Sequence, residues 1–275
     1  MVLAVVVVGT LVVRAVWFRD HARAVAVADA VERFRSTATT SAVADLSSSA
    51  SVDSASIVEP TATATATATV SPIAQIVPGV YRYRTAGGER IDAVGGTSHE
   101  YPAETALTVT TSGCGVWLRW DLLQERREEW QLCATDQGVA LQPVGSVYHE
   151  FFGVGETEQL RCDRAVVLVP SSEIAPPVAL DCMLADLAWL PVWEVLGRDT
   201  VDVGGVDVDA WHVRMTIVDD DDYPEHTTID WWLAASGLPL RMTSTTSSTS
   251  ASDLVGDVHY DEEYVAELVS LEPLS

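Results

Sequence analysis

The sequence predicts a mainly β (α+β) fold in which an antiparallel sheet forms an open half-barrel or a sandwich and helices are few. Three observations carry this prediction. Residues 199–242 contain alternating apolar and polar runs separated by glycine-containing turns, and similar runs recur from about residue 79 onward. A long segment before them consists almost wholly of serine, threonine, alanine and valine. Short, regularly spaced strands with turns between them are typical of sandwiches and barrels.

The first 20 residues are predicted to form a signal-anchor that crosses the membrane. Val2–Val13 is a run of apolar and small residues, and Arg14 lies near its end, where its side chain can reach the headgroups. A bilayer span needs about 20 residues, so the run is short, and a cleaved signal peptide is the alternative. Arginines follow the run, which by the positive-inside rule would keep the remaining chain cytoplasmic. The cysteines, considered below, lead us to expect an extracytoplasmic domain instead.

Residues 21–35 are predicted to contain a short juxtamembrane helix. Val27, Val31 and Phe34 fall near one face at helical spacing. Such a helix would either pack against the folded domain or form a solvated stalk.

Residues 36–75 are predicted to be a flexible linker. They include the repeat TATATATAT at 61–69, and such a composition cannot bury enough surface to offset the entropy of ordering. We therefore place one β-rich domain at 76–275.

The net charge of −24 lies almost entirely on this domain. Residues 1–35 carry +2 and residues 36–75 carry −3, which leaves −23 on residues 76–275. A domain this acidic repels nucleic acid and anionic lipid headgroups, so neither is expected as its partner. Adaptation to high salt is an alternative cause of the charge.

Strands are predicted throughout the domain. In residues 199–242, a hairpin turns at Gly204-Gly205 and another turns at Gly237, because glycine tolerates the positive φ values of such turns. Between them, Trp211, Val213, Met215 and Ile217 alternate with polar residues. Further strands are expected at 79–84, 90–94, 104–111, 115–122, 128–134, 139–144, 146–152 and 157–162. The best helical candidate in the domain is Met183–Leu196, broken by Pro191.

Four cysteines stand at 114, 133, 162 and 182, without the spacing or the histidines of a metal site. Of the three possible connectivities we favour Cys114–Cys133 and Cys162–Cys182, because each pair ties neighbouring strands or a strand to the loop that follows it. Disulfides imply an oxidising compartment outside the cytoplasm. The alternative is four free buried thiols in a cytosolic protein.

The domain shows no motif of a catalytic, metal or cofactor site. It has no G-x-S-x-G elbow, no phosphate-binding glycine loop and no H-E-x-x-H pair, so we expect neither a cofactor nor a metal. The acidic loop Asp219–Asp222 offers calcium-binding oxygens but lacks the D-x-D-x-D-G spacing, and a solvated hairpin loop is the better interpretation. A hydrolase that uses Asp121, His149 and Glu150 is the least favoured hypothesis.

Three short segments carry a resemblance: VGGVDVDAWHV at 203–213, DWWL at 230–233 and SGLPLR at 236–241. They resemble the C-terminal half of the bacterial lipoprotein-carrier family (LolA/LppX-like). The resemblance covers about residues 199–270 and implies an open half-barrel whose concave, apolar side accepts acyl chains. The chain departs from the family in lacking a lipobox cysteine near its N-terminus and in having few helices to close the barrel. The whole chain also resembles actinobacterial envelope proteins that share the anchor, the linker and the YPAET segment at 101–105, a likeness that carries no known function.

These observations favour a membrane-tethered extracytoplasmic binding domain that accepts a hydrophobic or lipid ligand on the concave face of its sheet. Its candidate ligand-binding residues share one sheet face and are Trp211, Met215, Ile229, Trp231, Leu238 and Leu240. Packing in a filled core is the other interpretation of the same residues. The expected partners are the membrane, through the anchor, and a lipid or an envelope protein. The alternative function is a structural or protein-interaction ectodomain without a small ligand.

Overall fold

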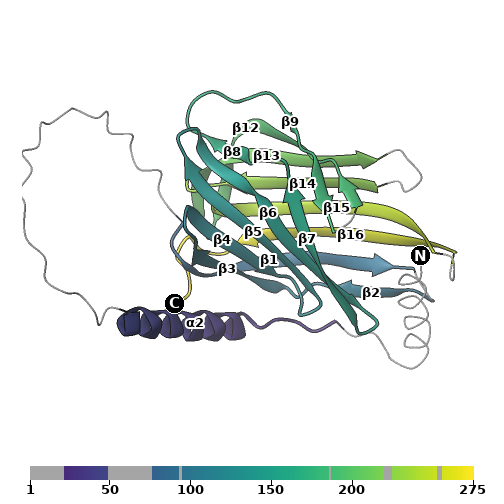
Figure 1. Cartoon of the computed structure of the whole chain (residues 1–275), viewed down its shortest axis with the longest axis horizontal. Coiled ribbons are helices and arrows are strands. Elements are labelled where there is room, and N and C mark those ends of the chain that lie inside the picture. The colour runs from purple at the N-terminus through teal and green to yellow at the C-terminus, as the bar shows by residue number, and fades with distance from the viewer. Residues whose placement is uncertain (1–21, 49–75, 93–94, 186, 220–224, 253–255) are drawn as a thin grey trace, which may run out of the picture.

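The computed structural model describes residues 22–48, 76–92, 95–185, 187–219, 225–252 and 256–275. It shows one helix followed by a single antiparallel sheet that curves into an open half-barrel (Figure 1). The helix and strands are α2 Val27–Ser48, β1 Gly79–Ile91, β2 Thr97–Glu100, β3 Glu104–Thr111, β4 Gly115–Asp121, β5 Arg126–Thr135, β6 Gly138–Phe151, β7 Val154–Cys162, β8 Val166–Pro170, β9 Val178–Ala179, β10 Cys182–Leu184, β11 Leu187–Trp189, β12 Val192–Val203, β13 Val206–Asp219, β14 Glu225–Leu233, β15 Pro239–Ser252 and β16 Gly256–Leu268. The mainly β, half-barrel prediction is therefore confirmed.

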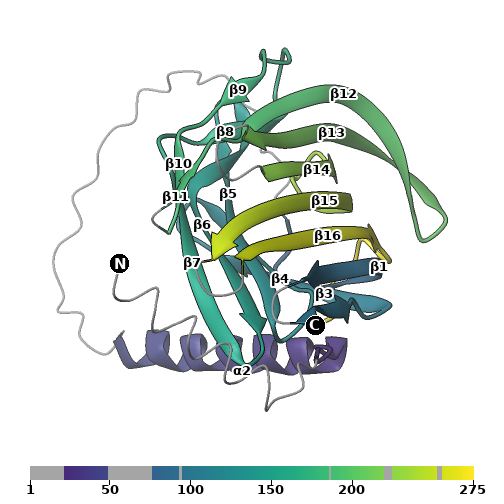
Figure 2. The same cartoon turned by 90° about the vertical axis from the view of Figure 1, so that its right-hand side faces the viewer.

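The strands follow one path through the sheet, in the order β11-β10-β7-β6-β5-β4-β3-β1-β16-β15-β14-β13-β12-β9. β2 pairs with β1, and β8 pairs with β6. We call β1 and β12–β16 the first wall and β4–β7 with β10 and β11 the second wall. Figure 2 shows the strands of the second wall crossing the stacked strands of the first wall at a steep angle. The two walls thus enclose one interior, with β3 connecting them.

The hairpins predicted in residues 199–242 are present. β12 and β13 meet at Gly204 and Gly205, whose φ values of 63° and 88° suit a two-residue turn. β14 and β15 meet at a turn that contains Gly237, with φ of 90°. A Cβ atom at Gly237 would lie 2.9 Å from Val139 of β6, so this turn packs closely against the second wall. Glycine is required there for both its backbone angle and its lack of a side chain.

Two pairs of segments that were predicted as separate strands, 79–84 with 90–94 and 139–144 with 146–152, each form one continuous strand. Residues 86–89 lie inside β1, which continues to Ile91, and residue 145 lies inside β6, which continues to Phe151. At Gly87 a Cβ atom would lie 2.0 Å from the carbonyl oxygen of Glu263 on β16. Gly145 similarly makes room for the ring of Trp130. Glycine in these strands marks a close approach of neighbouring groups rather than a reversal of the chain.

The prediction of a helix at Met183–Leu196 is wrong. This segment forms β10, β11 and the start of β12, with Cys182, Met183 and Leu184 paired to Trp189, Ala188 and Leu187. Pairing with β7 on one side and tertiary packing override the helical spacing of the apolar residues.

Helix α2 lies along the outside of the sheet at β1 and β3 (Figures 1 and 2). Ala30 is fully buried against Val80 and Ala106, and Val27, Val31 and Phe34 pack around this contact. The helix is therefore packed on the domain rather than a free stalk, and it continues past residue 35 to Ser48. Residues 1–20 of the predicted anchor and residues 49–75 of the predicted linker lie outside the described residues. Among those described, no helix is both long enough and apolar enough to cross a bilayer.

Candidate functional site

The inward-facing residues of the first wall change from apolar to polar along the strands. At one end, Trp211 pairs with Leu233, and Tyr83 pairs with Leu268. Towards the other end, the register places one polar row across the wall and β2, and its members are Thr227, Thr246, Glu262, Glu89 and His99. Because neighbouring members of a row are directly opposite each other, these side chains are forced together. The sheet therefore has a polar end.

The second wall faces this row with charged residues of its own. Every second residue of β5 points inward, and these residues are Arg126, Glu128, Trp130 and Leu132. The inward face of β5 therefore begins polar and ends apolar. Arg126 is 4% exposed and Glu128 is 5% exposed, which removes both charges from water. Buried charges require partners, and each finds them inside the barrel.

Arg126 joins the two walls. Its Nε donates a hydrogen bond to Oε1 of Glu262 over 3.2 Å, and its Nη2 donates to Oε1 of Glu128. Oε2 of Glu128 accepts from the indole Nε1 of Trp130 at 3.1 Å, and Oε1 of Glu262 also accepts from the hydroxyl of Tyr101. Nη1 of Arg126 is buried and has no hydrogen-bond partner within the described part of the chain.

Glu89 lies beside this guanidinium, with its Oε2 4.0 Å from Nε of Arg126. Its Oε1 lies 2.8 Å from Nδ1 of His99, and its Oε2 accepts a hydrogen bond from the hydroxyl of Tyr260 over 3.0 Å. Nε2 of His149 lies 3.5 Å from the same hydroxyl. Both oxygens of Glu89 are thus engaged by neighbouring side chains.

The surroundings of the network shift its protonation equilibria. Burial raises the pKa of Glu262 above its ordinary value, against the opposing effect of Arg126. Burial lowers the pKa of His149 well below its ordinary value, and the positive charge of Arg126 lowers it further. Burial also raises the pKa values of Tyr101 and Tyr260 well above the usual range. His149 is therefore neutral at pH 7, and both tyrosines keep their protons.

A pocket of about 340 Å³ lies between the walls at this end. This volume is within the range of about 300–1,000 Å³ that is common for small-molecule sites. The polar side of the pocket consists of Arg126, Glu128, His149, Glu158, Thr227, Thr246, Ser248, Tyr260 and Glu262. The apolar side consists of Trp130, Val147, Phe151, Leu160, Leu184, Trp189 and Ile229. An apolar wall with polar groups converging from one side is the usual construction of a ligand site.

A second hollow, of about 700 Å³, lies at β1, β2, β15 and β16. Glu262 lines both hollows. Apart from Tyr101 and His99, the second hollow is lined by glycine, hydroxyl and charged residues, and it offers less apolar surface than the smaller pocket. We therefore take the smaller, amphipathic pocket as the candidate site.

The six predicted ligand-binding residues belong to the interior, and one of them lines this pocket. Trp211, Met215, Trp231, Leu238 and Leu240 are buried in the main hydrophobic core. Ile229 is partly buried against that core and contributes to the pocket wall. The sequence placed these residues on one face, and the pocket occupies the polar end of that face.

The predicted hydrolase residues make three separate sets of contacts. Asp121 bonds to Arg33 of α2 and to Arg119, at 2.8 Å and 3.0 Å. Glu150 accepts a hydrogen bond from Tyr148 over 2.7 Å, whereas His149, next to it on β6, points into the pocket. Within the described ranges, no group of three or more His, Cys, Asp or Glu side chains is arranged to hold a metal ion. Residues 220–222 of the acidic loop lie outside the described residues.

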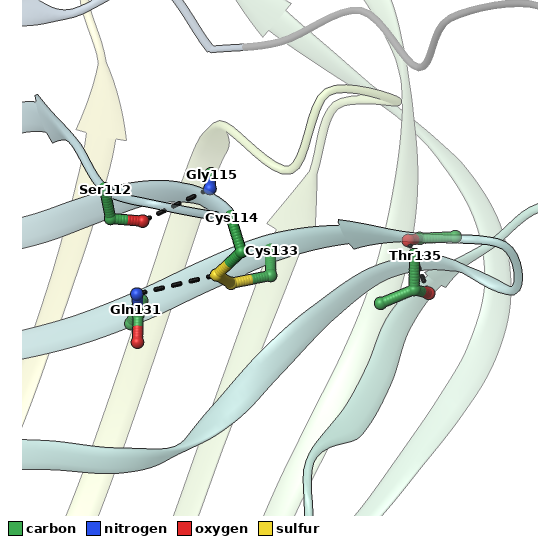
Figure 3. Close-up of a disulfide and its surroundings, with 7 residues drawn as sticks. Ser112, Cys114, Gly115, Gln131, Cys133 and Thr135 are labelled. Carbon is green, nitrogen blue, oxygen red and sulfur yellow. Dashed lines mark hydrogen bonds between the residues drawn. A yellow bond between two sulfur atoms is a disulfide. The ribbon is translucent and has the colours of Figure 1, made fainter.

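Two disulfides connect neighbouring strands with the pairing that the sequence predicted. Cys114 bonds to Cys133 between the start of β4 and β5, as Figure 3 shows. Cys162 of β7 bonds to Cys182 of β10, and these two residues are also direct cross-strand partners. The second bond fixes β10 near Leu184 and thereby fixes one side of the pocket.

The polar network was not predicted, although a sequence signal for it exists. In RREEWQLCAT, Arg126 and Glu128 have the same strand parity as Trp130 and Leu132. In 256–268, Glu262 has the parity of Tyr264 and Leu268. A charge on the apolar side of an alternating strand indicates a buried polar site.

No protein-family model, curated protein or solved structure matches this chain. The interpretation of the site therefore rests on its geometry.

Proposed function

We propose that this chain is a binding protein that holds a hydrophobic or amphiphilic ligand between the walls of its half-barrel. The observation that carries the proposal is the pocket of about 340 Å³, with Trp130, Leu160 and Ile229 on its apolar side and Arg126 and Glu262 on its polar side. Apolar surface favours the transfer of an alkyl chain or ring from water by about 25 cal/mol per Å² buried. The polar side fixes the orientation of the ligand.

We further propose that the domain is extracytoplasmic and tethered to a membrane by residues 1–20. The two disulfides support an oxidising compartment. The apolar run at Val2–Val13 supports the tether, and the half-barrel is compatible with the proposed likeness to lipoprotein carriers. A fusion of alkaline phosphatase to the C-terminus, which is active only where disulfides form, tests the orientation. An inactive fusion, together with free thiols in the chain, contradicts it.

The binding proposal is tested with the purified full-length chain and two matched variants. Ile229→Phe adds bulk on the pocket side of β14, whereas Thr228→Phe adds the same bulk on the opposite face of the same strand. We expect an uncharged fluorescent acylglycerol probe to bind to the native chain and to Thr228→Phe, and to bind at least about tenfold more weakly to Ile229→Phe. Organic extraction and mass spectrometry of the native chain then identify any ligand that copurifies. Equal probe binding by all three proteins contradicts the proposed pocket.

A second candidate function, a protein-interaction ectodomain, is favoured by one observation. Within residues 183–196, which lead from β10 into β12, the apolar residues Met183, Leu190, Val192 and Leu196 expose 43%, 59%, 37% and 41% of their surface. Several large exposed apolar residues in one segment are the kind of surface that a protein partner can cover. Charged substitutions at Met183 and Leu190 that abolish copurification with a stable partner, while probe binding persists, support this second function.

A further inference from the structure

The hydrogen-bonding pattern at the polar side of the pocket indicates which ligand headgroup fits. This inference rests on the proposed binding function. The starting point is the count of charges. Three carboxylates line the pocket, from Glu128, Glu158 and Glu262, together with one guanidinium, from Arg126. Glu89 adds a fourth carboxylate within 4.0 Å of that guanidinium.

An anionic headgroup is disfavoured by this excess of carboxylates. The one guanidinium already pairs with Glu128 and Glu262, so it has no charge left to neutralise another anion. Repulsion between like charges is strong in a buried site, where little solvent screens them. A fatty acid carboxylate or a phosphate is therefore a poor fit.

A cationic headgroup finds few free acceptors. Both oxygens of Glu128 are engaged, one by Arg126 and one by Trp130. Both oxygens of Glu89 are engaged by His99 and Tyr260. An ammonium group entering the pocket would compete with these donors and with the guanidinium itself.

One buried polar atom at this side of the pocket lacks a hydrogen-bond partner among the described residues, and this atom is a donor. Nη1 of Arg126 has no hydrogen-bond partner among the described residues, although the residue is 4% exposed and lines the pocket. A buried donor without an acceptor costs free energy that a suitable ligand oxygen would recover. We propose that the pocket selects an uncharged amphiphile, whose carbonyl or hydroxyl oxygen accepts a hydrogen bond from Nη1 of Arg126 while its alkyl chain lies against Trp130 and Ile229.

The test compares ligands that share one alkyl chain and differ in headgroup. Monodecanoylglycerol, decanoate and decylamine are titrated into the full-length native chain near neutral pH, and binding is measured by calorimetry and by the fluorescence of the pocket tryptophans. We expect the uncharged monodecanoylglycerol to bind at least about tenfold more tightly than either charged ligand. Decanoate or decylamine binding as tightly as monodecanoylglycerol overturns the inference but leaves the proposed binding function standing. Failure of all three to bind overturns both.

Two glutamine variants test the charge argument separately. Glu262→Gln removes a carboxylate from the pocket, and the control Glu263→Gln removes one from the exposed opposite face of β16. We expect Glu262→Gln to reduce the ratio of the dissociation constants of decanoate and monodecanoylglycerol by about tenfold. Glu263→Gln should leave this ratio unchanged. Because a glutamine side chain has nearly the same shape as a glutamate side chain, circular dichroism is expected to remain native. An unchanged difference in a folded Glu262→Gln protein contradicts the role assigned to the carboxylates.

Discussion

The indole of Trp130 on β5 meets the indole of Trp231 on β14 edge to face, with ring centroids 6.2 Å apart. Trp193 of β12 meets Trp231 in the same manner at 5.8 Å. Trp130 belongs to the second wall and Trp231 to the first, so the walls touch through their largest side chains. The half-barrel is therefore filled at these tryptophans, and the pocket lies beside them because the residues further along β5 and β16 are charged.

Replacement of Trp231 by alanine is expected to lower the free energy of unfolding by about 3–5 kcal/mol, because it opens a cavity where the walls meet. Trp130→Ala is expected to cost a similar amount. The double variant should cost less than the sum by about 0.5–1.5 kcal/mol, which is the usual energy of an aromatic pair. Urea unfolding measures all three. Trp117→Ala, on the outer face of β4, serves as the control and should lower the free energy of unfolding clearly less. Additive effects of Trp130→Ala and Trp231→Ala would contradict a direct interaction between the two rings.

The pH dependence of stability is expected to carry a contribution from His149. Burial and Arg126 lower the pKa of this side chain well below its ordinary value of 6.5. As the pH falls below 6.5, the unfolded chain binds a proton at His149 while the folded chain does not, so the native state loses stability. The free energy of unfolding of the native protein should therefore fall relative to that of His149→Gln as the pH is lowered from 7 towards 5.

The control for this measurement is His226→Gln, which changes an exposed histidine on β14. Subtracting its pH profile from that of the native protein removes the effect of losing a surface imidazole. If the difference in the free energy of unfolding between the native protein and His149→Gln stays constant over the same pH interval, the pKa of His149 is not lowered.

The two disulfides are expected to contribute about 3 kcal/mol each to the free energy of unfolding, since each closes a loop of similar length. Their cysteines are separated by 19 and 20 residues. Cys114→Ala/Cys133→Ala and Cys162→Ala/Cys182→Ala should therefore be destabilised similarly. Loss of the second bond should also weaken probe binding, because that bond holds β10, which carries the pocket residue Leu184.

Reductant provides the control for the disulfide prediction. It should lower the melting temperature of the native protein and leave a variant that lacks all four cysteines unchanged. A native melting temperature that is insensitive to reductant, with four alkylatable thiols by mass spectrometry, contradicts both bonds and the compartment inferred from them.

Local sequence patterns predicted the strands well because burial of one face imposes a period of two. The runs at 104–111 and at Trp211–Ile217 lie within β3 and β13, and the turns at Gly204-Gly205 and Gly237 lie where expected. The same reasoning divided β1 and β6 into two strands each, because Gly87 and Gly145 make close contacts with another strand and do not end their own strands. Such contacts depend on which strands become neighbours, and a local pattern does not contain that information.

The candidate site was harder to predict for the same reason. Ile229 was identified from its own strand, but Arg126, Glu89 and Glu262 come together only once β5, β1 and β16 are placed around one interior. The segment Met183–Leu196 has helical spacing, yet it forms strands because β7 offers β10 a pairing edge and a disulfide partner. Long-range pairing therefore decided both the site and the missed strands.

The docking of helix α2 gives the last prediction. Ala30 has no exposed surface where it meets Val80 and Ala106, so the helix approaches the sheet on small side chains. Ala30→Leu should overpack this contact and lower the free energy of unfolding by about 1–3 kcal/mol, or release the helix from the sheet. Ala28→Leu adds the same side chain at an exposed position and should have little effect.

Hydrogen exchange distinguishes the two results of overpacking, because release removes protection from α2 while β1 and β3 stay protected. The ion pair between Arg33 and Asp121 contributes little to holding α2 on the sheet, because Arg33 is about half exposed. Arg33→Ala should therefore release the helix far less than Ala30→Leu. Equal protection of α2 in Ala30→Leu and Ala28→Leu would show that the small-residue contact does not hold the helix.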